Sequence, residues 1–167
     1  ANSLGKRYRV LTWSERRNKL RAYVAVVGVG PGTTSVSVTT TVKTLGGAGV
    51  PAMSPGEERT FELAPFEVLN IETDQTLGEL TGSAIEASQP VAVFAGTMCS
   101  NVPDSTICEN GKCVFQPGWS CQAPEDCPVT CCCDHLEEQL PPLQAWGWRF
   151  VAPKSFDRGN ERDVYRI

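Results

Sequence analysis

The first 98 residues of this chain contain no cysteine, and the whole sequence holds a single histidine, His135. A lone histidine cannot supply the pair of imidazoles that many metal sites use. No apolar run approaches the ~20 residues that a membrane-spanning helix needs. Basic residues are in the minority, with 15 Lys and Arg against 19 Asp and Glu, so nothing here would attract a polyanion. These absences argue against a membrane span and against nucleic acid as a partner.

Segments with the helical period are scarce too, and short runs rich in Val, Thr, Ile, Phe and Tyr take their place. Such runs, separated by Gly and Pro, are typical of β-strands. In TTSVSVTTTV, Val36, Val38, Thr40 and Val42 would share one face of a half-buried strand. The predicted strands are residues 7–12, 23–27, 33–43, 58–63, 67–72, 83–87 and 90–94.

These strands predict an all-β fold. Their short spacing favours antiparallel pairing in a β-sandwich, and a propeller-like meander is the alternative. Helix is expected in only two places, residues 14–20 and residues 134–140, where Asp134 would cap a short turn. The 167 residues are predicted to form one all-β domain or repeat unit, residues 1–167, with a cysteine-rich insert at residues 106–132.

The glycine-rich stretch GVGPGTT, residues 28–34, follows a predicted strand as a dinucleotide-binding loop does. A dinucleotide loop must open a helix, whereas the residues that follow this one form one of the clearest strands in the chain. We therefore expect a hairpin turn, in which Pro31 fixes φ and Gly32 accepts a positive φ.

Eight cysteines crowd into one proline-containing segment: Cys99, Cys108, Cys113, Cys121, Cys127, Cys131, Cys132 and Cys133. An even number in a loop-rich segment predicts a disulfide framework in an oxidising compartment. The alternative is zinc held by cysteine thiolates and His135, but the Cys-x-x-Cys pairs of structural zinc sites are missing. We therefore expect disulfides and no metal.

The sequence does not give the disulfide connectivity, because eight cysteines allow about a hundred complete pairings. Adjacent cysteines rarely bond to each other. Cys131, Cys132 and Cys133 are therefore each expected to reach a separate partner upstream.

The stretch DHLEEQ, residues 134–139, brings carboxylates and the histidine together, as a hydrolytic site would. No serine lies in a Gly-x-Ser-x-Gly elbow and no second histidine exists, so we expect neither an enzyme nor a catalytic residue. His135 is expected to be structural, with a ring nitrogen bonded to a backbone carbonyl or a carboxylate. No cofactor is expected; calcium bound by Glu137, Glu138 and backbone oxygens is the alternative.

Three tryptophans are candidate binding residues: Trp119 lies in the insert, and Trp146 and Trp148 follow it in the sequence. Trp146, Trp148 and Phe150 alternate and would share one face of an extended strand. Burial in the core is expected for this face. An exposed aromatic ladder that binds a glycan or a protein is the alternative.

Four stretches of the sequence carry a resemblance to a known family: GELTGSAI (78–85), QPVAVFAGTMCSNVP (89–103), CDHLEEQLPPLQAWG (133–147) and FVAP (150–153). They resemble the N-terminal domain of the IgG-Fc-binding protein family, whose bacterial members are mostly large exported proteins. The resemblance covers about the last 90 residues well and the first 77 only through the strand pattern.

The resemblance implies an extracellular or cell-surface location and no enzymatic activity. It also implies that Cys99 pairs with Cys133, because a short loop separates the corresponding cysteines in the family. Such a bridge would close a loop of about 35 residues and stabilise the fold by about 3.8 kcal/mol on the chain-entropy model. Residues 106–132 would then be an insertion whose six cysteines form three further disulfides of their own.

The two ends of the chain suggest a larger assembly. The chain begins at Ala1 with neither Met nor a signal peptide, so we expect a processed protein or a piece of a longer one. RYRVL at residues 7–11 is echoed by VYRI at 164–167, and in the family a similar strand opens the next repeat. A strand that stops there leaves edge groups unpaired, which predicts a fragment of a repetitive protein or strands exchanged between copies.

These observations predict an extracellular structural or adhesive β module that takes part in a surface assembly or filament through strand sharing. The alternative is a secreted recognition module that binds a glycan or a protein ligand through the cysteine-rich insert and the loops. The expected partners are therefore a protein, a second copy of the chain or a glycan.

Overall fold

The computed structural model describes residues 3–14, 20–75, 77–101, 108–114, 116–123, 126–128, 133–154 and 156. Its strands are β1 (Gly5–Arg9), β2 (Ala22–Gly28), β3 (Thr34–Thr39), β4 (Glu58–Leu63), β5 (Val68–Glu72), β6 (Ala84–Ser100), β7 (Cys108–Glu109), β8 (Lys112–Cys113), β9 (Gln116–Ser120) and β10 (Asp134–Gln139), followed by the 3-10 helix η2 (Leu143–Ala145). The predicted all-β class is confirmed.

The chain divides into two compact units, residues 1–100 with 135–146 and residues 101–134 with 147–167. The first unit holds a seven-stranded antiparallel sheet, and the second holds a three-stranded sheet in the order β7-β8-β9. In the part of the chain that is described, no helix has the length and hydropathy that a membrane crossing requires.

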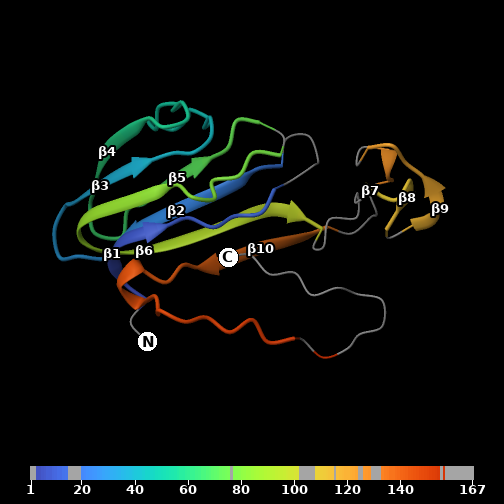
Figure 1. Cartoon of the computed structure of the whole chain (residues 1–167). Helices are drawn as coiled ribbons and strands as arrows, with labels where there is room; N and C mark the ends of the chain where they lie inside the picture. Colours follow the sequence, from blue (N-terminus) through green and yellow to red (C-terminus); the bar gives the residue numbers. More distant parts are fainter. Residues whose placement is uncertain are drawn as a thin grey trace. The chain divides into compact units, whose positions relative to one another are not determined.

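The long strand β6 organises the first unit (Figure 1). Its first part pairs with β3, where Val38 lies opposite Ile85, and its later part pairs with β2, where Gly28 lies opposite Val91. The strands β4 and β5 extend the sheet beyond β3 and β2. Since Ile85 also lies opposite Tyr8, β1 pairs with the other side of β6. The strand β10 pairs with β6 as well.

A break in pairing divides β6 into two halves. Between Ala87, the last residue opposite β3, and Val91, the first opposite β2, no register connects β6 to either strand. Pro90 lies in this gap, where its missing N–H costs no ladder hydrogen bond. The side chains of Ser88 and Gln89 bond the backbone of the neighbouring segment at Ser35 and Thr33. The two strands predicted at residues 83–87 and 90–94 are therefore one strand.

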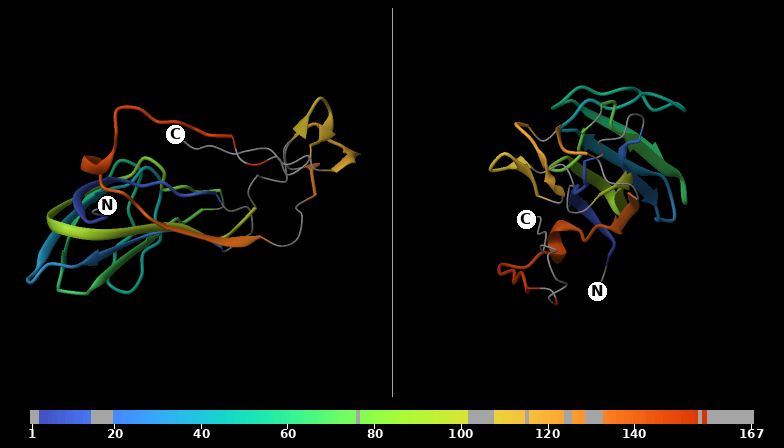
Figure 2. Two further views of the ribbon diagram at one scale, coloured as in Figure 1. Left: turned by 90° about the horizontal axis from the view of Figure 1, so that it is seen from below. Right: turned by 90° about the vertical axis from the view of Figure 1, so that its right-hand side faces the viewer.

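The sheet curls so that its two halves enclose a single core, as in the predicted sandwich (Figure 2). The core side chains come from every strand of the first unit except β10, and include Tyr8, Val24, Val26, Val36, Val38, Leu63, Ile71, Ile85 and Val93. The alternation predicted for β3 is confirmed, because Val36, Val38, Thr40 and Val42 are all buried. Leu140, just beyond β10, is buried in the same core.

Two local predictions are wrong. Residues 28–34 do not form a hairpin turn, because β2 and β3 pair with β6 rather than with each other. Gly28 serves a close approach there, since a Cβ on it would lie 2.7 Å from the Ala64 carbonyl oxygen. Residues 134–139 form the strand β10 and not a capped helical turn. A helix was also predicted at residues 14–20. Residues 15–19 of that range lie outside the described residues.

Candidate functional site

One candidate site is a polar cluster that joins β2 to β10. The Tyr23 hydroxyl donates a hydrogen bond to Glu137 Oε2 at 2.5 Å. His135 Nε2 lies 3.2 Å from the Tyr23 hydroxyl and 3.3 Å from Glu137 Oε2. The rings of Tyr23 and His135 stack with their centroids 6.1 Å apart. Tyr23 thus meets two polar side chains of a strand that is more than 110 residues away in the sequence.

The strand geometry explains how these residues meet. Tyr23 lies opposite Gly96 of β6, and β10 lies along β6 beyond it. A Cβ at position 96 would clash with the Leu136 carbonyl oxygen and would lie 2.9 Å from the Tyr23 hydroxyl. Gly96 therefore leaves the space through which Tyr23 reaches His135 and Glu137. Because side chains alternate along a strand, His135 and Glu137 lie on the same face of β10.

The cluster shifts the acidity of two of its members. Hydrogen bonds from Tyr23 and then from His135 hold the pKa of Glu137 below its usual range. Burial, together with the hydrogen bond to the Glu137 carboxylate, raises the pKa of Tyr23. The Tyr23 proton is committed to Glu137, so His135 Nε2 must carry a hydrogen to face both oxygens without lone-pair repulsion. The cluster is thus a tyrosine and a histidine donating to one carboxylate.

This arrangement ties β2 to β10. The predicted structural role of His135, with a ring nitrogen at a carboxylate, agrees with the His135 to Glu137 contact. Glu138 follows Glu137 in β10, where successive side chains point to opposite faces. Calcium held by Glu137, Glu138 and backbone oxygens stays a prediction. Tyr23 was not predicted from the sequence. Its aromatic ring on the solvent side of β2 was the only local signal, since Glu137 is 114 residues away.

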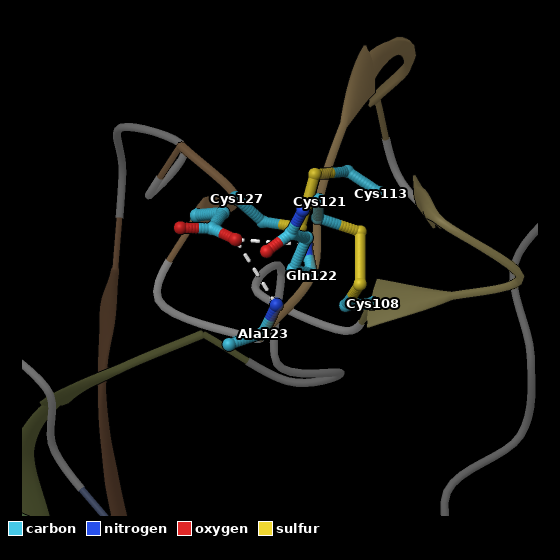
Figure 3. The surroundings of a disulfide bond; sticks show 7 residues. Cys108, Cys113, Cys121, Gln122, Ala123 and Cys127 are labelled. Carbon is cyan, nitrogen blue, oxygen red and sulfur yellow. Dashed lines mark hydrogen bonds between the residues drawn. A yellow bond between two sulfur atoms is a disulfide. The ribbon is translucent and has the colours of Figure 1, made fainter.

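The second candidate site is the three-stranded sheet of the second unit. Disulfides join Cys108 to Cys121 and Cys113 to Cys127 (Figure 3). Cys113 and Cys127 are almost fully buried, so sulfur replaces a hydrocarbon core in this small sheet. Cys99 and Cys133 are also disulfide-bonded, and their pairing with each other stays a prediction.

The turns of this sheet suit their residues. Asn110 and Gly111, between β7 and β8, have φ values of 53° and 74°, as a tight hairpin of the mirror-image type requires. The Asp126 carboxylate accepts hydrogen bonds from the backbone N–H groups of Gln122 and Ala123, at 2.8 and 3.0 Å (Figure 3). These bonds hold the pKa of Asp126 below its usual range. The loop after β9 is thereby fixed beside the disulfides.

The disulfides correct one prediction. Cys108, Cys113, Cys121 and Cys127 bond to one another, which leaves Cys99 as the one remaining cysteine before residue 131. Three separate upstream partners for Cys131, Cys132 and Cys133 are therefore impossible, because four of the five upstream cysteines are engaged. Cys131 and Cys132 themselves lie outside the described residues.

The zinc alternative can be examined at the same place. Among the described residues, the sulfurs of Cys113, Cys121 and Cys127 lie within 4.8 Å of one another. All three belong to the two disulfides, so thiolates for a metal would exist only after both bonds were reduced. His135 is engaged instead with Tyr23 and Glu137.

The predicted binding tryptophans are exposed. Trp119 in β9 is 59% exposed, Trp146 is 48% exposed and Trp148 is fully exposed. Phe150 is also exposed, so the expected burial of the 146–150 face is wrong. Binding of a glycan or a protein by these side chains stays a prediction. The indole N–H of Trp146 donates a hydrogen bond to the Pro141 carbonyl.

Comparison of the sequence with known proteins places the chain in a family. The family model described as IgGFc binding protein matches residues 1–167, including the first 77 residues, where the resemblance was loose. The IgGFc-binding protein of Homo sapiens is 29% identical over 153 residues, which are 90% of this chain and 2% of that protein. The chain thus spans a small fraction of this relative's length. No solved structure matches the chain. On the match over its full length, this disulfide-bonded all-β chain belongs to the IgGFc-binding protein family.

Proposed function

We propose that this chain is an extracellular, non-enzymatic recognition module that binds a protein through its disulfide-bonded β7-β8-β9 sheet. The family and the disulfides support this proposal, because disulfides persist in oxidising compartments. The observation that carries it is the exposed Trp119 on β9.

Trp119 combines two properties of an interface anchor. A tryptophan that is 59% exposed offers a large amphipathic surface, and tryptophan is enriched at the residues that dominate binding energies. The strand that carries it is held by disulfides nearby: Cys121, just after β9, is bonded to Cys108, and Cys113 in the adjacent strand β8 is bonded to Cys127. A rigid support reduces the entropy lost on binding.

The partner can be tested directly. The name of the human relative makes immunoglobulin Fc the first protein to examine. Binding of the chain to immobilised Fc should be lost when residues 106–132 are replaced by a short loop, and weakened at least tenfold by Trp119→Ala. Trp146→Ala, which removes an exposed tryptophan outside this sheet, is the control and should bind as the parent does. Unchanged binding by Trp119→Ala would disprove the assigned surface.

A glycan is the other ligand class for an exposed tryptophan, and a glycan array distinguishes the two. Recognition of Fc that persists after enzymatic deglycosylation would support a protein surface. Recognition that follows the glycan alone would replace the protein by a sugar as the ligand.

A second candidate function is structural or adhesive, with copies sharing strands in a surface assembly. The exposed apolar segment after η2, with Trp148 and Phe150, favours it. If the C-terminal residues exchange between copies, deletion of Asp163 to Ile167 should abolish self-association. Those residues lie outside the described part of the chain.

A further inference from the structure

The segment at residues 147–152 exposes apolar side chains without gaining a strand partner. Trp148 is fully exposed, Phe150 is 71% exposed and Val151 is 85% exposed, yet no strand register includes these residues. The sequence GWRFVA is rich in residues that favour strands, and Pro153 would end such a strand. Contiguous exposed apolar residues of this kind mark an interaction surface. We call residues 147–152 the donor segment.

The edge strand β5 offers backbone groups that could receive such a segment. Thr73 N–H donates to the Ala22 carbonyl, so residues 69, 71 and 73 direct their backbone groups toward β2. Residues 68, 70 and 72 therefore direct theirs away from the sheet. The Glu72 carbonyl accepts a hydrogen bond from Leu45, which leaves Val68 and Asn70 as the open part of this edge.

The turn before β5 presents an exposed aromatic residue in an unfavourable conformation. Phe66 is 81% exposed and has a φ of 65°, a left-handed conformation that bulky residues rarely adopt. It is held there by a hydrogen bond from its N–H to the Gly28 carbonyl at 2.6 Å. Neither the exposure nor the conformation helps the isolated fold, and such outliers point to a function elsewhere. Val68, two residues later, is 54% exposed, so two exposed apolar side chains stand at the start of the open edge.

The opposite edge strand, β4, is protected where β5 is not. Glu58, Arg59 and Glu62 lie along β4, and charges on an edge strand oppose strand addition. The middle of β5 carries no charge. Glu67 precedes the strand and Glu72 is its last residue. Strand addition is therefore expected at β5 rather than at β4.

Charge also matches the donor segment to β5. Residues 143–154 contain Arg149 and Lys154 and no acid. The acids Glu67 and Glu72 flank β5, so a basic apolar strand would meet an apolar edge between two carboxylates. Complementary charge of this kind favours association and fixes register.

We propose that the donor segment of one copy adds as a strand to the edge of β5 in a second copy, with Trp148 and Phe150 covering Phe66 and Val68. The proposal rests on the second candidate function, self-assembly, and not on recognition by Trp119. Donor and acceptor are different surfaces, so the contact is head-to-tail: it forms a closed ring or a swapped dimer where the rotation closes, and an open chain of copies where it does not.

Light scattering during size-exclusion chromatography tests this on the full chain at rising concentration. Asn70→Pro removes an outward N–H of β5 without touching the bonds to β2, and should reduce the oligomers to monomers. Glu62→Pro is the matched control, because the pairing of Thr40 with Glu57 makes residue 62 an outward position of β4. It should associate as the parent does. Trp148→Ala with Phe150→Ala, on the donor side, should also give monomers, and decides the matter if Asn70→Pro does not fold.

Mixing supplies the sharpest result. The Asn70→Pro chain keeps its donor and the Trp148→Ala, Phe150→Ala chain keeps its acceptor, so the mixture should form one-to-one dimers that grow no further. A folded Asn70→Pro chain that still associates would overturn the acceptor assignment while leaving self-assembly intact. A parent chain that stays monomeric to about 100 μM, a concentration at which contacts with a Kd of about 100 μM or tighter are populated, would overturn self-assembly itself.

Discussion

The hydroxyl of Tyr23 in β2 donates a 2.5 Å hydrogen bond to the carboxylate of Glu137 in β10, on the far side of β6. The two residues are 114 positions apart, and the cysteine-rich segment lies between them in the sequence. The bond therefore anchors the returning chain to the sheet at the point where it leaves that segment.

Removing this bond should loosen β10. Tyr23→Phe deletes only the donor, so we expect a loss of about 0.5 to 1.5 kcal/mol in the free energy of unfolding. The pKa of Glu137 should also rise toward its ordinary value, because the hydrogen bond that lowers this pKa most is gone. Urea unfolding measures the first effect and a carboxyl NMR titration the second. An unchanged Glu137 titration would show that the bond is not formed in solution.

The space left by the missing side chain of Gly96 should matter as much for the stability of β10 as the Tyr23 to Glu137 hydrogen bond. Gly96→Ala places a Cβ against the Leu136 carbonyl oxygen and the Tyr23 hydroxyl, so β10 must shift. Overpacking of this kind costs about 1 to 3 kcal/mol. Gly32→Ala is the control, since a Cβ at that position meets no atom within 4 Å and should leave the urea midpoint nearly unchanged. Equal effects of the two variants would refute the close approach.

Acid should weaken the same cluster. The folded pKa of Glu137 lies below the ordinary value of 4.5, so the charged carboxylate contributes its stability fully above about pH 4.5. That contribution is lost as the pH falls through the lowered pKa. The stability difference between the parent and Glu137→Gln should therefore shrink between pH 7 and pH 3. Glu138→Gln, which changes the neighbouring carboxylate outside this cluster, is the matched control in the same thermal unfolding series.

The disulfides of the second unit give a covalent prediction. Peptide mapping without reduction should recover Cys108 linked to Cys121 and Cys113 linked to Cys127. Each bridge spans 13 or 14 residues, for which the chain-entropy model gives about 3 kcal/mol. Replacing Cys113 and Cys127 together by Ser should remove protection from hydrogen exchange in residues 108–123 and leave β2 and β6 protected. Loss of protection in β6 as well would contradict two separate units.

The strands were predictable because their signal is local. Alternation of apolar and polar residues marks which face of β3 is buried, and the structure buries Val36 and Val38 as the pattern requires. The boundaries were less accurate, because the pairing that ends a strand lies elsewhere in the sequence. Pro90 divided β6 in the prediction, yet it falls in a gap between two pairing regions and interrupts nothing.

The stretch DHLEEQ shows where local signals fail. Asp134 and the following acids fit a capped helical turn, but the open side of β6 needs a partner and Gly96 leaves room for one. The backbone hydrogen bonds gained by pairing with β6 override the weak helical preference of six residues. The same tertiary pairing brings His135 and Glu137 to Tyr23, which no spacing in the sequence indicates.

The sequence by itself determined the all-β class, the buried face of β3 and the oxidised, cysteine-rich character of the region after residue 98. Each of these depends on composition or on a period of two residues, which are local properties. Only the tertiary structure decided which cysteines pair, that Tyr23 meets Glu137, and that Trp148 and Phe66 stay exposed. Those outcomes depend on which distant strands share an edge, because a contact between residues far apart in the chain is set by the register of the whole sheet.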